Sequence, residues 1–301
     1  LPSSGPGLIP FAAESADGLP SHKQFTQEFR LESTGNGALK WLAGLYYFDE
    51  KIKIDSFNYD SLSAGNPVNG YATQDQTNKA WAVFGSVNLD VSEAIKLRGG
   101  LRYTKDKKDY FADRITPPPF SSTFVGRRTA NTDASNTSGD FSASYALDKA
   151  SQVYFRVATG FRAPSIQGRL LFADNISVAR SEKVTSYEVG YKADLLNRRV
   201  RVSAAAFTYT LKDQQLTLVG GAANTAQLIN IPKSVGSGVE FSGQFLATEN
   251  LLLALGGSVN STKIKAPGQS VPICGGGCTV TNAISPATGG ALIDGNPLPQ
   301  A

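Results

Sequence analysis

The feature that most constrains this chain is a hydrophobic pattern that repeats every two residues. Between residues 95 and 104, Leu97, Leu101 and Tyr103 fall on one side, and Arg98 and Arg102 alternate with them. Residues 24–31, 140–145, 152–157 and 239–247 alternate in the same way. Period two places successive side chains on opposite faces of an extended strand. No segment keeps the three-to-four residue spacing of an amphipathic helix, so the sequence predicts an all-β chain.

The alternating segments are joined in pairs by short turns. Turn-forming residues occur at 34–37, 91–94, 147–150, 196–198 and 248–250, and each group separates two alternating runs, as in β-hairpins. Long connections rich in polar residues, Gly and Pro alternate with these turns, at about residues 50–74, 105–137, 162–183, 212–236 and from 266 onward. The order predicts about ten antiparallel strands with up-and-down connections, short turns at one end and long loops at the other.

This asymmetry is typical of a transmembrane β-barrel, which has short periplasmic turns and longer extracellular loops. No run of about 18 apolar residues predicts a membrane-spanning helix, whereas a tilted barrel strand needs only about ten residues with alternating faces. Because lipid offers no hydrogen-bond partners, a membrane sheet has to close on itself. The chain contains no Met, and residues 1–20 do not resemble a signal peptide, so we expect a processed or truncated N-terminus.

Aromatic side chains gather near the expected strand ends, including Trp41, Trp81, Tyr103, Tyr187 and Phe207. Such residues form belts at membrane interfaces, where an amphipathic ring suits the headgroup level. The alternative is that Tyr and Phe simply favour strands.

Several classes of function are disfavoured by composition. The net charge is +4, but the basic residues are scattered, so we expect no nucleic-acid partner. The single His22 argues against a catalytic triad, so we expect no enzyme, and it argues against a zinc site and any cofactor. Cys274 and Cys278 are candidates for a small disulfide loop in an oxidising compartment, with two free thiols as the alternative.

Six segments together resemble the barrel of the TonB-dependent outer-membrane receptors. They are WLAGLYYFD at 41–49, AVFGSV at 82–87, LRGGLRYT at 97–104, FRVATGFRAPS at 155–165, SEKVTSYEVGYK at 181–192 and GVEFSG at 238–243. The stretch ending in GFRAPS is the most specific of them. The resemblance covers nearly the whole chain, and the segments follow the expected order.

This resemblance implies a 22-stranded barrel with an N-terminal plug in its lumen. It further implies residence in the outer membrane of a Gram-negative bacterium and contact with its lipid. The cargo would be a scarce nutrient, most often an iron–siderophore complex, and TonB would supply the energy through a segment ahead of the plug. Residues 1–301 are then expected to form part of the barrel, without the plug and without the C-terminal strands.

Charged residues on the polar strand faces are the candidates for the lumen, where they would contact the plug or line a solute path: Arg98, Arg102, Arg156, Glu188, Lys192 and Glu240. The alternative is a hydrated inner surface held by salt bridges. The candidates for ligand contacts in the external loops are aromatic and cationic, which suits an anionic or aromatic solute: Phe120, Phe124, Arg127, Arg128 and Arg162. For Arg162, which precedes Pro164, the alternative is a structural start of a loop.

Three functional hypotheses follow. The first is active uptake by a plugged receptor, and the second is a passive porin without a plug. The third is a soluble all-β binding protein, which would need its apolar faces to pack against each other in a sandwich.

Overall fold

The computed structural model describes residues 14–119, 122–220, 225–273 and 281–299. Every regular element in these ranges is a β-strand. In the same ranges, no helix has the length and apolar character needed to cross a membrane. The strands are β1 (Glu14–Glu32), β2 (Leu39–Tyr59), β3 (Val68–Asp90), β4 (Ile95–Thr116), β5 (Gly126–Ala146), β6 (Ser151–Arg162), β7 (Ser165–Gln167), β8 (Ser177–Ala179), β9 (Glu182–Leu195), β10 (Val200–Gly220), β11 (Thr225–Thr248), β12 (Leu251–Ile264), β13 (Ser270–Val271) and β14 (Ala291–Leu292).

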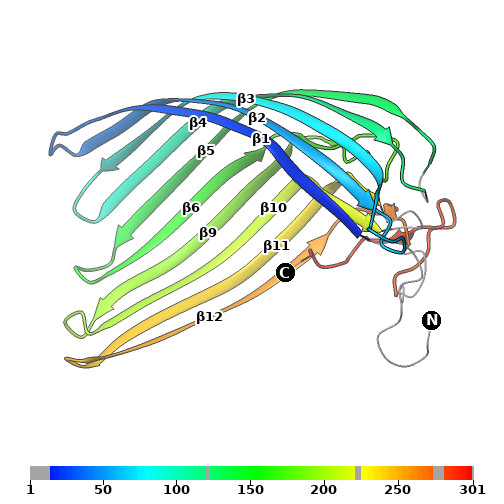
Figure 1. Cartoon of the computed structure of the whole chain (residues 1–301). Coiled ribbons are helices and arrows are strands. Elements are labelled where there is room, and N and C mark those ends of the chain that lie inside the picture. The colour runs from blue at the N-terminus through cyan, green and yellow to red at the C-terminus, as the bar shows by residue number, and fades with distance from the viewer. Residues whose placement is uncertain (1–13, 120–121, 221–224, 274–280, 300–301) are drawn as a thin grey trace.

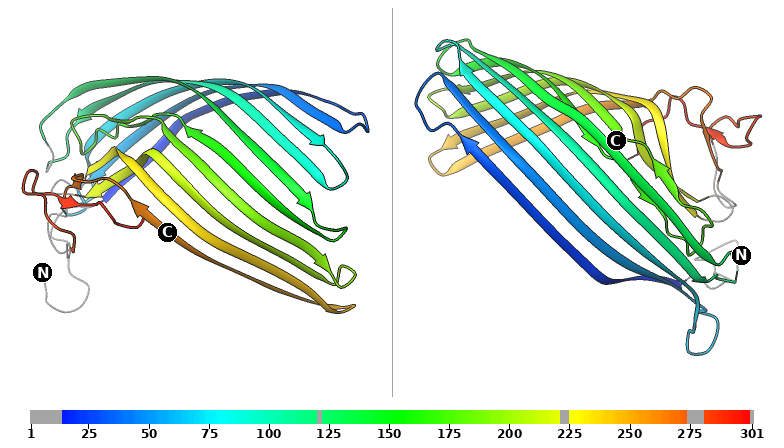
Figure 2. Two further views of the ribbon diagram at one scale, coloured as in Figure 1. Left: turned by 180° about the vertical axis from the view of Figure 1, so that it is seen from behind. Right: turned by 90° about the horizontal axis from the view of Figure 1, so that it is seen from above.

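Ten of the strands form one antiparallel sheet in the order β1-β2-β3-β4-β5-β6-β9-β10-β11-β12. Each strand therefore pairs with the next long strand along the chain, and the short pair β7-β8 is inserted between β6 and β9. The sheet is strongly curved and twisted, like a segment of a barrel wall (Figures 1 and 2). The prediction of about ten up-and-down antiparallel strands is confirmed.

The five short connections lie together at one end of the sheet, on the left in Figure 1. All five coincide with predicted turns. In the turn between β5 and β6, the Asp148 carboxylate accepts hydrogen bonds from the Ala150 amide at 2.7 Å and the Ser151 hydroxyl at 2.8 Å. These bonds, the Ala150 amide first, hold the pKa of Asp148 below its usual range. The turn between β9 and β10 places Leu196, Asn197 and Arg198 in the left-handed region, with φ of 50°, 54° and 66°.

At the opposite end the predicted loops were too long, because the strands continue through them. β4 extends to Thr116 and β5 begins at Gly126, so most of the predicted loop at 105–137 is a strand hairpin. The same correction applies at residues 50–74 and 212–236. The connection between β6 and β9 remains long and contains β7 and β8, and the described part of the chain from residue 266 onward also stays mostly irregular, with only the short strands β13 and β14.

The strand register separates the side chains into two faces. One rung of paired residues runs across nine strands and is apolar throughout: Leu39, Leu89, Leu97, Ala143, Phe155, Val189, Ala206, Val239 and Val259. The adjacent rung points to the other side and is mostly polar: Lys40, Asn88, Arg98, Ser142, Arg156, Glu188, Phe207, Gly238 and Asn260. We call these two sides the apolar face and the polar face.

The rungs are slanted relative to the turns. The apolar rung begins at Leu39, the first residue of β2, and crosses β6 at Phe155, four residues after the strand begins at Ser151. It reaches β12 at Val259, eight residues after that strand begins at Leu251. Such a stagger accompanies the tilt of strands in a barrel wall.

The aromatic residues are divided between the faces. Trp41, Trp81, Tyr103 and Tyr187 lie on the apolar face and are exposed. Phe207 pairs with Glu188 and therefore lies on the polar face, so its predicted place in an interfacial belt is wrong. For Phe207 the strand preference of aromatic residues is the better explanation.

The two clusters of buried apolar side chains lie at the loop end of the sheet, although small residues such as Ala82, Ala193 and Ser151 are buried elsewhere. Ile231, Ile264, Ala266 and Ile293 form one buried cluster, and Tyr110, Ala112 and Leu170 form another. A single-layered wall buries large side chains where a further segment folds over it. The apolar face has no such cover in the described residues, and Val189 and Val259 remain 55% and 73% exposed.

Candidate functional site

Charged side chains of β4, β5, β6 and β9 meet on the polar face in a group that we call the wall cluster: Arg98, Asp140, Tyr154, Arg156, Glu188 and Lys192. The register puts Arg98, Ser142, Arg156 and Glu188 on one rung, because the turns at 91–94 and 147–150 fix how these strands pair. The Arg98 Nε atom lies 3.7 Å from an Asp140 carboxylate oxygen.

The second half of the wall cluster is held by Tyr154. Its hydroxyl donates a 2.6 Å hydrogen bond to Glu188, and the Lys192 Nζ atom lies 5.2 Å from the centre of its ring. These residues line an open depression of about 360 Å³ together with Arg98, Asp140 and Arg156. Three cationic groups against two carboxylates give the depression a net positive charge, which favours an anionic surface or solute.

The six predicted lumen residues all lie on the polar face, but they do not form one site. Arg98, Arg156, Glu188 and Lys192 line the depression of the wall cluster. Arg102 has its guanidinium 5.2 Å and 5.3 Å from the rings of Tyr46 and Phe84. It lines a second depression of about 440 Å³, which Arg98 and Arg156 also line. Glu240 is exposed on β11, opposite Ala205 and Ser258.

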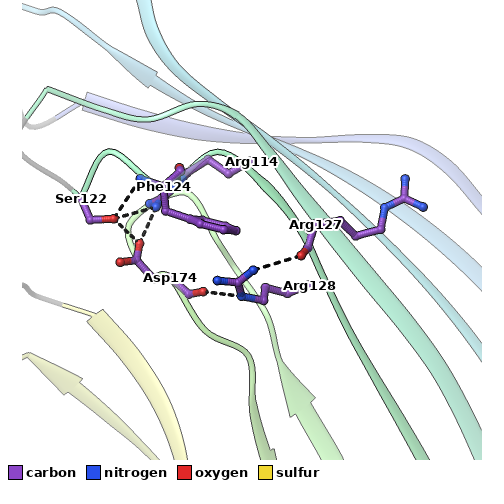
Figure 3. Close-up of polar contacts among 6 residues, drawn as sticks. All are labelled: Arg114, Ser122, Phe124, Arg127, Arg128 and Asp174. Carbon is purple, nitrogen blue, oxygen red and sulfur yellow. Dashed lines mark hydrogen bonds and ion pairs between the residues drawn. The ribbon is translucent and has the colours of Figure 1, made fainter.

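A second polar group, which we call the loop cluster, lies at the loop end of the sheet and consists of Arg114, Ser122, Phe124, Arg128 and Asp174 (Figure 3). Arg114 is its centre, with a side chain that is completely buried. Its Nε donates to the Phe124 carbonyl at 2.6 Å, and its Nη2 donates to the Ser122 hydroxyl at 3.0 Å and to the Asp174 carboxylate. Within the described residues its Nη1 atom has no hydrogen-bond partner.

The Phe124 ring contacts two guanidinium groups. The Cζ atom of Arg114 lies 5.2 Å from the ring centre, and that of Arg128 lies 3.8 Å from it. Both distances are within the range of cation–π attraction. Arg128 also donates from Nε to the Asp174 carbonyl at 3.1 Å. The loop cluster therefore contains two arginines, one aromatic face and one carboxylate.

The electrostatic environment of Asp174 is set by its neighbours. The Ser122 hydroxyl, followed by the hydrogen bond and charge of Arg114 and the charge of Arg128, holds the pKa of Asp174 below its usual range. Desolvation opposes this shift only partly. The carboxylate therefore stays ionised at neutral pH and holds the connection between β6 and β9 against β4 and β5.

The same connection packs closely on β4. Leu170 is fully buried against Tyr110 and Ala112, which lie on the same face as Arg114. At Gly168, a Cβ atom would lie 2.3 Å from the Tyr110 ring, so only glycine permits this approach.

A chain of hydrogen bonds continues from Tyr110 toward β1. The Tyr110 hydroxyl donates to Gln74 at 2.9 Å, Gln74 donates to Ser56 at 3.1 Å, and Ser56 donates to Asp17 at 2.6 Å. Arg169, from the connection, lies 3.3 Å from Asp17. The connection is thus fixed across the polar face from β5 to β1.

The predicted loop contacts have different positions. Arg127 and Arg128 are successive residues of β5 rather than loop residues, and they point to opposite faces. Arg127 binds Asp113 through two nitrogen atoms and lies 4.4 Å from the Phe111 ring, away from Arg128. The expectation that these two arginines lie in a loop is therefore wrong, and their contact with a ligand stays a prediction.

The remaining predicted contacts are Phe124, Arg162 and three residues outside the described ranges. Phe124 lies in the connection between β4 and β5, as expected. Arg162 is the last residue of β6 and is exposed. Phe120, Cys274 and Cys278 lie outside the described residues, so their roles stay predictions.

Sequence reasoning missed Arg114 and Asp174. A signal for Arg114 exists, because the even-numbered positions from Arg102 through Tyr110 to Arg114 share one face when β4 is extended to Thr116. Asp174 carries no such signal, because it is irregular in structure and meets Arg114 from a distance of 60 residues in sequence.

The family model of the TonB-dependent receptor-like β-barrel matches residues 5–301. The chain belongs to the TonB-dependent receptor β-barrel family. The predicted resemblance and the outer-membrane location are confirmed. The TonB-dependent receptors are transport proteins and not an enzyme family. No curated protein matches the sequence significantly.

Solved TonB-dependent receptors share the fold. The ferric yersiniabactin uptake receptor FyuA of Yersinia pestis superposes with a TM-score of 0.68 at 21% identity, over 81% of this chain and 36% of that one. The siderophore receptor PiuA of Acinetobacter baumannii gives 0.62 at 15% identity, over 91% and 41%. The ferric-catecholate import receptor Fiu of E. coli K12, in its closed form, gives 0.60 at 16% identity, over 83% and 39%. The chain thus spans less than half the length of these receptors.

Proposed function

We propose that this chain is part of the wall of an outer-membrane receptor that takes up a scarce nutrient, with an iron–siderophore complex as the first candidate. The observation that carries the proposal is the alternation of an apolar rung with a mostly polar rung across nine strands. One face then suits acyl chains and the other suits an aqueous lumen. The family and the siderophore receptors among the similar structures support this function.

Within this proposal, six charged side chains of the polar face would face the plug or the path of the solute. The side chains involved are Arg98, Arg102, Arg156, Glu188, Lys192 and Glu240. Charged groups at these positions cost little in a hydrated lumen, whereas Arg or Lys facing lipid at the membrane centre costs about 2–4 kcal/mol. The plug, the TonB-contacting segment and the remaining strands would belong to the same receptor, outside residues 1–301.

The loop cluster would provide a contact for the ligand at the external mouth. The partly exposed Arg128 and Phe124 ring would make the contact, and the buried Arg114 packs against the same ring from within. Guanidinium groups bind carboxylate and other anionic oxygen atoms well, and the ring offers an aromatic surface. An anionic, partly aromatic metal chelate would suit both features.

A strain that lacks the receptor gene tests this function. We expect the deletion to abolish growth on the cognate ferric siderophore under iron limitation, and we expect the gene to restore uptake of radioactive iron. Uptake should stop when TonB is inactivated or the proton gradient is collapsed. Uptake that continues without TonB would instead indicate a passive porin.

The soluble alternative is not supported by the fold. It requires a second layer on the apolar face, and in the described residues the apolar face of the ten-stranded sheet has no such layer. Fractionation of cells gives a direct check, because the receptor should be recovered with the outer membrane and require detergent for extraction.

A further inference from the structure

Four lysines form a row on the apolar face of β9–β12, near the loop end. Lys183 of β9 pairs with Lys212 of β10, and Lys212 pairs with Lys233 of β11. The amide of Lys265 donates to the carbonyl of Lys233 at 2.8 Å, which continues the ladder just past β12. All four side chains are exposed. We call them the lysine row.

Together with the rungs below it, the lysine row forms a gradient of increasing side-chain polarity along these four strands. The apolar rung of Val189, Ala206, Val239 and Val259 is followed, toward the loop end, by Tyr187, Thr208, Ser237 and Ser261. The next rung is Thr185, Thr210, Val235 and Lys263, and the lysine row follows it. The surface therefore passes from apolar to hydroxyl-bearing to cationic, as a wall that crosses from acyl chains into headgroups should.

The height of the lysine row agrees with this order. Lys183 lies twelve residues before the end of β9 at Leu195, and Lys212 lies twelve residues after the start of β10 at Val200. Twelve residues that rise ~3.3 Å each, on strands tilted by ~40°, reach ~30 Å above the turns. The outward apolar band of such barrels is ~25 Å tall. The lysine row thus falls at the headgroups of the external leaflet.

Three lysines of β3 and β4 have different electrostatic surroundings at a similar height. On β3 and β4 three lysines of the apolar face have aspartate partners: Lys79 lies 3.6 Å from Asp49, Lys105 lies 3.5 Å from Asp133, and Lys107 lies 3.8 Å from Asp109. Lys51 and Lys53 of β2 lie on the same face and have no such partner among the described residues. In the part of the chain that the structure describes, no carboxylate lies within 4 Å of a lysine of the row. The nearby carboxylate of Asp213 forms its ion pair with Arg180 instead.

We propose that the lysine row binds the phosphate groups of lipopolysaccharide in the external leaflet. Like charges directly opposite each other destabilise a sheet, and a phosphate placed between two ammonium groups would remove this repulsion. Lysine acts as a point charge that binds phosphate well, and basic residues at a membrane surface attract anionic headgroups. This binding is independent of the solute that the receptor carries.

The test uses the full receptor purified in detergent and the triple variant Lys183→Gln, Lys212→Gln and Lys233→Gln. Binding of lipid A with two phosphates is measured by native mass spectrometry and by titration at two salt concentrations. Each lysine should contribute roughly 5-fold, so the triple variant should bind on the order of 100-fold more weakly. Affinity of the wild type should also fall as salt rises.

The matched control is the triple variant Lys79→Gln, Lys105→Gln and Lys107→Gln, which removes the same charge from the paired lysines. It should bind within about 3-fold of the wild type, because each of these lysines is already occupied by an aspartate. Equal losses in the two triple variants would overturn the proposal, and so would unchanged binding after loss of the lysine row. Equal affinity of the wild type for phosphatidylglycerol would refute the assignment to lipopolysaccharide.

Discussion

Replacement of Val239 by lysine tests the division of the sheet into two faces. Val239 lies near the middle of the apolar-face run of β11, from Phe245 to Val235, and it pairs with Ala206 and Val259. A lysine that faces lipid near the membrane centre costs about 2–4 kcal/mol. The ratio of folded to unfolded receptor should therefore fall roughly 30- to 700-fold.

The measurement is the free energy of unfolding of the full receptor in lipid vesicles, from reversible urea titration. The control is Glu240→Lys, one residue along the same strand, whose side chain lies on the polar face. This change should alter the free energy of unfolding by less than about 0.5 kcal/mol. If Glu240→Lys costs as much as Val239→Lys, the faces have been assigned incorrectly.

Three further predictions concern the loop end. Gly168→Val should detach the connection between β6 and β9, because the glycine has no room for a Cβ atom, and amide exchange in residues 163–181 should rise. The control Gly35→Val, where a Cβ meets nothing within 4 Å, should leave this exchange unchanged. If the amides stay protected after Gly168→Val, the proposed packing is refuted. Because the pKa of Asp174 is lowered, its contribution to stability is fully present above its usual pKa of 3.8 and is lost as pH falls through the lowered value. Protection of the amides there, corrected for the intrinsic pH dependence of exchange, should thus be constant from about pH 5 to 8 and fall only in stronger acid. Asp174→Asn should lower this protection at every pH, and a transition near neutrality would contradict this account. Arg128→Gln should weaken ligand binding at least several-fold while Arg127→Gln should not, as judged by uptake of labelled ligand; equal effects would mean that both arginines reach the mouth.

The part of the fold that lies in the membrane was predictable from the sequence. Between Ile95 and Thr104 the strand has lipid on one face and water on the other, so the polarity of each side chain indicates the face to which it points. The turn at 91–94 then fixes the register, and Arg98 meets Ser142 where the pattern implies. Where the strands extend beyond the membrane, both faces are solvated, so the alternation of apolar and polar side chains is lost. The continuation of β4 to Thr116 therefore looked like a loop.

The candidate site was predictable only in part, for a related reason. Strand parity is enough to place Arg98, Arg156 and Glu188 on one face. The pairing of Arg114 with Asp174 depends instead on how an irregular connection folds over β4, which is decided by packing of Leu170 rather than by local pattern. Composition alone suggested a cationic and aromatic mouth, but it could not reveal that Arg127 and Arg128 diverge.

The slant of the hydrogen-bonded rungs has a consequence for membrane depth. Leu39 and Val259 belong to the same rung of paired residues, yet Leu39 is the first residue of β2 whereas Val259 lies eight residues after the start of β12. Successive residues of one hydrogen-bonded rung therefore lie at increasing depth in the membrane, from the inner headgroups at β2 to the hydrocarbon centre at β12. The same charge introduced at both positions would be tolerated at Leu39 and penalised at Val259, since the cost of a charge on the lipid side grows toward the bilayer midplane.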